Sequence, residues 1–389
     1  MHVQKLLQNF LSSVMHQKRL TTLIIMVMTA LKTKKLSLTD LGRAIDLPIA
    51  ERSCIRRSDR FLSNKKLHIE REIIHITIAR KIIGARNQPD IIVDWSAVPN
   101  TTHHILRAAM VGRGRALTLY EEVHPEKKLG NKRVQNKFLQ TLKTILPASC
   151  YPIIITDAGF HNDWFKKVRR LGWHYLGRIR GKKHVRILTN NSEWQPSSAL
   201  FSKATSTPKC LGKTELCESN PLTVNLCLFK AKKKGRKGLT KSGNKRTDKN
   251  SLQYRKSAKE PWVLATSLPE NRLLANRAIK KYQKRMEIEE SFRDLKSSRY
   301  GFGFENSYSK KINRIEILLL VAMLASLVAW LTGLVSEKRN MHYNFQSNTT
   351  KNRRVLSLFF LGCQVIKRKI KIPINELISA FDEELSCAF

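Results

Sequence analysis

Acidic residues are scarce in this chain. It has 30 aspartates and glutamates against 72 lysines and arginines, which gives a formal net charge of +42 over 389 residues. Such an imbalance argues against an acidic solubilising role and favours a polyanionic partner, most often nucleic acid. An anionic membrane surface is the rival partner that the charge alone leaves open.

Paired cysteines are missing as well. The number of cysteines is odd and no C-x-x-C pair occurs among the seven, which are Cys54, Cys150, Cys210, Cys217, Cys227, Cys363 and Cys387. This pattern fits neither a disulfide framework nor a zinc site. We therefore expect scattered buried thiols in a protein of a reducing compartment.

Long uncharged runs are few, and two of them need a decision. Leu23–Leu31 is followed by "KTKK" instead of the small residues of a cleavage site, so a buried helix is expected and not a signal peptide. Ile317–Val335 has 19 residues without a charge and is long enough to span a membrane. The sequence has no second span, and a central helix buried in a large α/β core explains this run equally well.

The middle of the chain changes its hydrophobic period. Strand-like segments are "DIIVDW", "HHILRAAMV", "RALTLYEEV", "YPIIITDAGF" and "WHYLGRIRG", and helical spacing occurs in "NKRVQNKFLQTLKTIL" and "NDWFKKVRRLG". The predicted order is β-β-β-α-β-α-β. A three-strand meander followed by βα crossovers predicts a mixed sheet with helices on its faces.

The segment from about Arg186 to Trp262 is irregular and strand-rich, with "PLTVNLCLF" and "PWVLATSL" as its clear strands. Between them, Lys230–Lys259 holds 13 bases and one acid. We expect a mobile basic loop that can bind phosphates, although a solvated loop without a ligand would have the same composition.

Residues 1 to about 80 have helical patterns. Ser37 and Thr39 are candidate N-caps of a short helix that Pro48 ends, and an arginine-rich helix follows with Arg52, Arg56, Arg57 and Arg60. Two short helices with a basic second one suggest a helical DNA-binding domain. A solvated basic helix is the plain alternative.

Two aspartates follow apolar runs that read as buried strands. Asp94 comes after Ile91–Val93, and Asp157 comes after Ile153–Thr156. The end of a buried strand is rigid and can hold an acid in place for a metal ion. An aspartate in such a position also commonly caps a turn.

The third acid lies in "KYQKRMEIEESFRDLK", Lys281–Lys296, which we expect to form one helix. At 3.6 residues per turn, Tyr282, Arg285, Glu289 and Lys296 fall within a stripe of about 60°. Glu287 and Glu290 fall outside it. Together, Asp94, Asp157 and Glu289 provide the hard oxygen ligands that suit two Mg²⁺ ions acting on a phosphodiester.

The spacing Tyr282-x2-Arg285-x3-Glu289-x6-Lys296 resembles the Y-R-E-K signature of bacterial insertion-sequence DDE transposases. "IVDWS" around Asp94 and "TDAGF" around Asp157 resemble the other two acidic motifs of that family. "LTDLGRAI", "SAKEPWVLAT" and "RMEIEESFRDLKS" look like the transposon-ten-like branch of insertion sequence family four. The resemblance covers nearly the whole chain.

The resemblance implies a fold and a division into domains. The fold is an α/β RNase H-like core, with a mixed five-stranded sheet and helices on both faces, a β-rich insertion and an all-α N-terminal DNA-binding domain. The expected parts are a helical end-binding domain (1–80), the first part of the core (81–185), the β-rich insertion with the basic loop (186–270), the second part of the core (271–340) and a helical dimerisation region (341–389).

The resemblance also implies the chemistry. Asp94, Asp157 and Glu289 would bind two Mg²⁺, for which Mn²⁺ can substitute. Tyr282, Arg285 and Lys296 would contact phosphates and the terminal nucleotide, and Trp262 would stack on a base flipped out beside a DNA hairpin. The expected partners are double-stranded transposon ends and target DNA, held by a homodimer in the bacterial cytoplasm at the nucleoid, with no membrane.

Three other interpretations stay open at this point. A catalytically decayed copy would act only as a basic DNA-binding protein, for example through residues 37–62. A plain nuclease of the same fold would cut ends without joining them. A membrane-associated basic protein would use Ile317–Val335.

Overall fold

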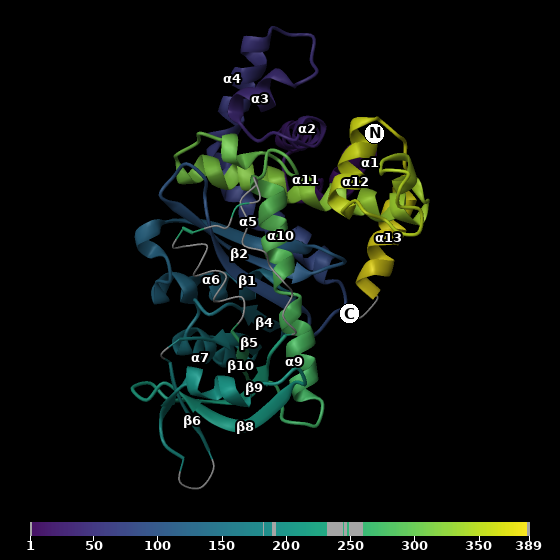
Figure 1. Cartoon of the computed structure of the whole chain (residues 1–389). Coiled ribbons are helices and arrows are strands. Elements are labelled where there is room, and N and C mark those ends of the chain that lie inside the picture. The colour runs from purple at the N-terminus through teal and green to yellow at the C-terminus, as the bar shows by residue number, and fades with distance from the viewer. Residues whose placement is uncertain are drawn as a thin grey trace. The chain divides into compact units, whose positions relative to one another are not determined.

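The computed structural model describes residues 2–181, 183–188, 192–231, 244, 247–248 and 260–386. These residues form two compact units, drawn in Figure 1. Unit 1 combines two separate segments of the chain, 1–150 and 286–389, and unit 2 is the segment between them, Tyr151–Arg285. Most of the lysine-rich stretch 230–259 lies outside the described residues.

Unit 1 begins with five helices: α1 (His2–Leu11), α2 (Gln17–Thr33), α3 (Leu38–Arg43), α4 (Glu51–Leu62) and α5 (Lys65–Ile83). The start of α3 is fixed by Ser37, whose Oγ accepts from Asp40 N at 3.1 Å. The apolar run Leu23–Leu31 lies within α2, where most of its side chains are buried. The prediction of a buried helix for this run is confirmed.

The sheet of unit 1 is an antiparallel meander in the order β3-β2-β1, formed by β1 (Asp90–Ala97), β2 (His103–Val111) and β3 (Ala116–Pro125). Helix α6 (Lys132–Ile145) follows β3 and packs against it and against α5. Successive side chains of a strand point to opposite faces, so the long buried stretches in β2 and β3 show that both faces of these strands are covered.

The second segment of unit 1 supplies the helices α10 (Met286–Lys296), α11 (Ile312–Lys338), α12 (Leu358–Lys367) and α13 (Ile374–Ser386). Helix α11 is long and apolar enough to cross a membrane, yet 94% of its apolar window is buried inside the protein. It packs against α2, α12 and β3. The prediction of a buried central helix at Ile317–Val335 is therefore confirmed.

Helices α11 and α12 approach each other closely because both carry glycine at the crossing. A Cβ built on Gly333 would lie 2.0 Å from Leu358 O, and one built on Gly362 would lie 1.8 Å from Ala329 O. Both contacts are far below van der Waals distance, so any larger residue at either position would force the two backbones apart.

Unit 2 holds a mixed sheet in the order β4-β5-β10-β9-β8-β6-β7. Its strands are β4 (Ile153–Thr156), β5 (His174–Ile179), β6 (His184–Ile187), β7 (Gln195–Pro196), β8 (Lys209–Leu216), β9 (Leu222–Phe229) and β10 (Trp262–Thr266), and its helices are α7 (Asn162–Arg170) and α9 (Leu274–Gln283). Strands β4 and β5 are parallel, joined by the α7 crossover, and the other pairs are antiparallel.

The element order predicted for the middle of the chain, β-β-β-α-β-α-β, is confirmed from β1 to β5. The strands predicted in "PLTVNLCLF" and "PWVLATSL" are also confirmed, as β9 and β10. The protein is thus a mixed α/β protein. The five-part division into domains stays a prediction.

Candidate active site

Asp94 lies inside β1 and not at its end. Strand β1 continues through Trp95 and Ser96 to Ala97, because these residues pair with Leu106, Ile105 and His104 of β2. The strand-end position predicted for Asp94 is therefore wrong. The side chain is 9% exposed, and its Oδ1 accepts from the backbone N–H of Trp95 at 2.8 Å. Because β1 pairs with β2 along nearly its whole length, the Asp94 carboxylate is held on a rigid strand.

A row of charged side chains crosses the three strands of unit 1 at this level. Arg107 of β2 is the partner of Asp94 in the strand register, and Glu121 of β3 is the partner of Arg107. The Arg107 guanidinium donates to Glu121 Oε2 from Nε at 2.8 Å and from Nη2 at 2.7 Å. Arg107 is 4% exposed and Glu121 is 1% exposed, so the pair compensates two charges that water does not reach.

Helix α10 brings Glu289 and Lys296 to the same unit as Asp94. They are seven residues apart, so they lie on the same face of the helix, two turns from each other. Lys296 Nζ donates to Ser96 Oγ of β1 at 2.7 Å, and Glu289 is exposed. Burial and the nearby positive charge of Arg107 lower the pKa of Lys296 to about 8, while the negative charge of Asp94 acts in the opposite direction.

The segment Lys281–Lys296 is not one helix. Helix α9 ends at Gln283 and α10 begins at Met286, with a turn at Lys284 and Arg285. The N–H groups of these two residues bond three residues back, to Lys281 O and Tyr282 O, so the helical ladder is interrupted. The single stripe predicted from Tyr282 to Lys296 is therefore wrong, and only its Glu289–Lys296 part stands.

Asp157 follows β4 directly, as predicted for the end of a buried strand. Its Oδ1 accepts from Gly159 N at 2.9 Å, which closes a turn within the "DAG" sequence. The side chain is half-buried. In the described part of the chain, the other carboxylate oxygen of Asp157 makes no hydrogen bond.

Trp262 and Tyr282, 20 residues apart in the sequence, are in contact in unit 2. Trp262 is the first residue of β10. Its ring packs edge-to-face against the ring of Tyr282 on α9, with the ring centroids 5.0 Å apart. Tyr282 is 4% exposed, and Trp262 is half-buried. The contact therefore fixes one side of the indole and leaves part of it accessible.

Two arginines of unit 2, Arg178 and Arg180, share the carboxylate of Glu260. Arg178 of β5 lies within 3.7 Å of Glu260, and Arg180 donates to the same carboxylate at 2.7 Å. Burial lowers the pKa of Arg178, and the charges of Arg180 and Arg285 add to this effect. Arg178, which the sequence motifs did not include, thus places a second positive charge near Tyr282 and Arg285.

The two arginines predicted to bind DNA lie on α4 and differ in their surroundings. Arg56 is exposed. Arg57 is half-buried, and its Nη2 donates to Thr22 Oγ1 of α2 at 3.4 Å. Arg56 is available to a partner, while Arg57 also connects α4 to α2.

The donor chemistry of the three predicted acids fits a hard divalent cation. Carboxylate oxygens are the ligands that Mg²⁺ and Mn²⁺ prefer. Asp94 and Glu289 belong to unit 1, and Asp157 belongs to unit 2. Among the described residues, no group of three His, Cys, Asp or Glu side chains is arranged to hold a metal ion.

Sequence reasoning missed Arg107, Ser96 and Ser291. The Oγ of Ser291, on α10, accepts from Arg107 Nη1 at 3.3 Å. One signal was present for Arg107, which is the only charged residue in the otherwise apolar centre of "HHILRAAMV". A charge in a strand that must be buried requires a partner, although the sequence does not identify the partner.

Comparison with known proteins gives one family and one structural likeness. The family model described as the Transposase DDE domain matches residues 88–328, more than half of the chain. No curated protein matches the chain. Among solved structures, the chain is similar to the piggyBac transposase in its synaptic complex with hairpin DNA, at 12% identity and a TM-score of 0.42, over 99% of this chain and 79% of that chain.

Proposed function

The chain belongs to the transposase DDE domain family, and on that premise we propose that it is a cut-and-paste DNA transposase of the Y-R-E-K, transposon-ten-like branch. Membership of the family makes it a protein of transposition and DNA recombination. The proposal adds the branch, the RNase H-like core, the metal ions, the substrate and the order of steps.

Asp94, Asp157 and Glu289 are the proposed catalytic acids and the ligands of two Mg²⁺ ions, which Mn²⁺ can replace. When bound, such ions make an attacking oxygen more nucleophilic and stabilise the leaving oxygen at phosphorus. The protein's own contribution is to hold the carboxylates rigidly. Asp94 is held by strand pairing and by the N–H of Trp95, and Asp157 by the turn at Gly159.

Tyr282, Arg285, Lys296 and Trp262 are the proposed DNA contacts. Lys296 would donate to a phosphate oxygen from its position beside β1, with Ser96 orienting its ammonium group. Trp262, held on one side by Tyr282, would stack on a base turned out of the duplex. Arg56 and Arg57 of α4 would contact the transposon end further away.

The proposed reaction consists of transfers at phosphorus. Water attacks at the transposon end and releases a 3′-OH, which attacks the opposite strand and forms a hairpin. A second water opens the hairpin, and the 3′-OH then attacks target DNA. Each attack forms one phosphorus–oxygen bond and breaks another, so no redox partner is required.

The proposed setting follows from the same function. The substrates are double-stranded transposon ends and target DNA, which the charge of +42 favours through phosphate contacts. We place the protein in the bacterial cytoplasm at the nucleoid, as a homodimer that holds two ends, without a membrane. The burial of α11 supports the last point.

The observation that carries the proposal is the meeting of α10 with β1. Lys296 lies 200 residues after Ser96 in the sequence, yet it bonds to Ser96 and interacts with Asp94. The fold thus brings the lysine of one motif to the aspartate of another. A chance occurrence of either motif would not require such a contact.

The test is a cleavage-and-joining assay on a labelled duplex of the element's own end with target DNA and Mg²⁺. Wild-type protein should give metal-dependent nicks, hairpins and joined products, and Glu289→Gln should give none while it binds the duplex normally. Glu290→Gln is the matched control, since Glu290 is the neighbouring, half-buried carboxylate of the same helix and pairs with Arg293.

Other outcomes identify the alternatives. Cut ends that are never joined would indicate a nuclease. Tight binding without any scission by the wild type would indicate a decayed copy that acts as a basic DNA-binding protein. Equal loss in Glu289→Gln and Glu290→Gln would refute the role assigned to Glu289.

A further inference from the structure

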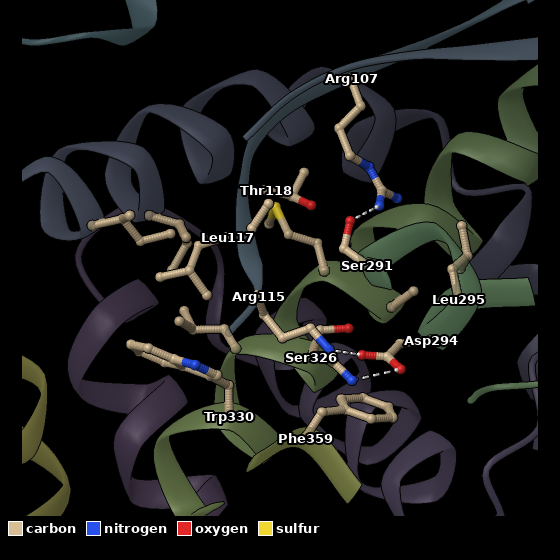
Figure 2. A pocket seen from close by; sticks show the side chains of 16 residues that line it. Arg107, Arg115, Leu117, Thr118, Ser291, Asp294, Leu295, Ser326, Trp330 and Phe359 are labelled. Carbon is tan, nitrogen blue, oxygen red and sulfur yellow. Dashed lines mark hydrogen bonds and ion pairs between the residues drawn. The ribbon is translucent and has the colours of Figure 1, made fainter. Parts of the chain in front are cut away.

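Arg107 connects three elements of unit 1 through one buried side chain. It belongs to β2, donates twice to Glu121 of β3, and donates from Nη1 to Ser291 Oγ of α10. Its guanidinium also lies over the ring of Phe292, 4.4 Å from the centroid. Figure 2 shows Arg107 pointing at Ser291 across the interface between the sheet and the helix.

The position of Arg107 relates it to two of the proposed catalytic acids. It is the strand partner of Asp94, and the helix that it contacts carries Glu289, two residues before Ser291. Arg107 therefore lies between the strand that holds one acid and the helix that holds another. The mechanism proposed above gives it no task.

A second arginine binds the same face of α10. Arg115, in the turn before β3, donates to Asp294 Oδ2 from Nε at 2.5 Å, and Asp294 is one turn after Ser291. Asp294 is 4% exposed, and Figure 2 shows this pair below the first one. Two contacts one turn apart on one face prevent the helix from rotating about its axis.

Rotation of α10 decides where Glu289 points. Two residues correspond to about 200° around a helix, so Glu289 faces away from Ser291, and its direction is set by the anchoring on the other side. Catalytic groups need to be held within roughly 0.5 Å and 10–20° of the productive geometry. Hydrogen bonds depend on direction, so the two contacts restrain the rotation of α10 in addition to its apolar packing.

We infer that Arg107, with Arg115 as the second anchor, is a positioning residue that fixes the rotation of α10 and thereby the direction of Glu289. This inference rests on the proposed function. Arg107 touches neither DNA nor the reacting atoms in this scheme, because its side chain is buried and its guanidinium binds Glu121 and Ser291. Its effect is transmitted through the helix.

The primary test is Ser291→Ala, which removes the helix side of the contact and leaves the buried Arg107–Glu121 pair in place. Mn²⁺ binding to the complex with the end duplex is measured by the loss of the free-ion EPR signal, beside the cleavage rate. We expect the dissociation constant for Mn²⁺ to rise several-fold and cleavage to fall about tenfold or more. Duplex affinity and the unfolding midpoint should stay as in the wild type.

Arg107→Lys is the companion variant, since Arg107→Gln would leave Glu121 buried without a partner and confuse positioning with folding. One ammonium group can keep the charge beside Glu121 but cannot also reach Ser291. We expect a folded protein with the same deficit in Mn²⁺ binding as Ser291→Ala. Ser336→Ala is the matched control, because this buried serine of α11 donates to Thr332 O within its own helix.

The outcomes separate the two hypotheses. If the wild type cleaves, Glu289→Gln does not, and Ser291→Ala binds Mn²⁺ and cleaves like the wild type, the positioning role is overturned and the proposed function stands. If the wild type shows no metal-dependent cleavage, the proposed function fails and this inference fails with it. If Ser336→Ala shows the same deficit, the effect is general packing and not positioning.

Discussion

Cys210 of β8 and Cys227 of β9 are direct partners across an antiparallel strand pair. Directly opposed residues in such pairs have Cα atoms about 4.5–5.5 Å apart, within the range that a disulfide spans. Cys227 is buried and Cys210 is half-buried, and a hydrogen bond from Cys227 lowers the pKa of the Cys210 thiol. The described cysteines are free thiols, as expected. These two, 17 residues apart in sequence, are nevertheless brought together by the strand pairing and are not scattered.

Mild oxidation should join Cys210 to Cys227. Treatment of the folded protein with hydrogen peroxide should form one disulfide, with the two thiols losing two protons and two electrons and the peroxide being reduced to two water molecules. Peptide mapping before and after reduction measures it. Cys210→Ser should abolish the cross-linked peptide, and Cys363→Ser, which removes a buried thiol on α12, should not. Recovery of both peptides as free thiols would contradict the prediction.

The stability of unit 1 should fall as the pH falls below about 6.5, through His75. This side chain is buried, its Nδ1 lies 3.0 Å from Leu119 O, and burial lowers its pKa to about 3 from 6.5. The unfolded chain therefore takes up the proton first, so the stabilisation is complete above pH 6.5 and is lost toward pH 3. Each pH unit in that window corresponds to about 1.4 kcal/mol.

Urea unfolding of the wild type and of His75→Gln at pH 7 and pH 5 checks this. Glutamine keeps a neutral donor but does not titrate. Between pH 7 and pH 5, the free energy of unfolding of the wild type should fall by about 2 kcal/mol more than that of the variant. Parallel pH dependences in both proteins would exclude His75 as the cause.

Trp262→Ala should slow the proposed hairpin step more than it lowers the stability of the protein. The indole is half-buried against Tyr282 and Phe229, so part of its face is open to a base. Base stacking on such a ring is worth about 1–3 kcal/mol, so hairpin formation should slow by roughly 5- to 150-fold. Trp262→Phe should keep most of the rate, and Trp194→Ala is the control in the same unit. Equal hairpin yields from Trp262→Ala and the wild type would remove the stacking role.

Gly362→Ala should destabilise the crossing of α11 and α12. The added methyl group would lie 1.8 Å from Ala329 O, a backbone atom that cannot rotate away. Overpacking of this kind costs typically about 1–3 kcal/mol. Thermal unfolding should show a lower midpoint for Gly362→Ala and a still lower one for Gly362→Ser. A midpoint equal to that of the wild type would contradict a close backbone contact between α11 and α12 at Gly362.

Local pattern was enough to predict the order of elements from β1 to β5, the buried α11 and the place of Asp157, because each depends on a periodicity or a turn signal nearby. Local pattern gave wrong predictions where contacts between residues distant in the sequence determine the structure. Whether β1 ends at Asp94 depends on its pairing with β2. Helix α9 ends at Gln283 without a glycine or proline that would indicate the end in the sequence. The Arg107–Ser291 contact joins residues 184 positions apart, which no window can reveal.

The division of unit 1 into two segments has a consequence for synthesis on the ribosome. When residue 285 has been made, all of unit 2 exists, but unit 1 still lacks α10, α11, α12 and α13. The apolar surfaces of β3 and α2 that α11 covers are then open to chaperones. Glu289 is also added after both aspartates. A nascent or prematurely terminated chain ending there is thus an incomplete domain, and the last quarter of the message supplies one of the three acids of the proposed catalytic centre.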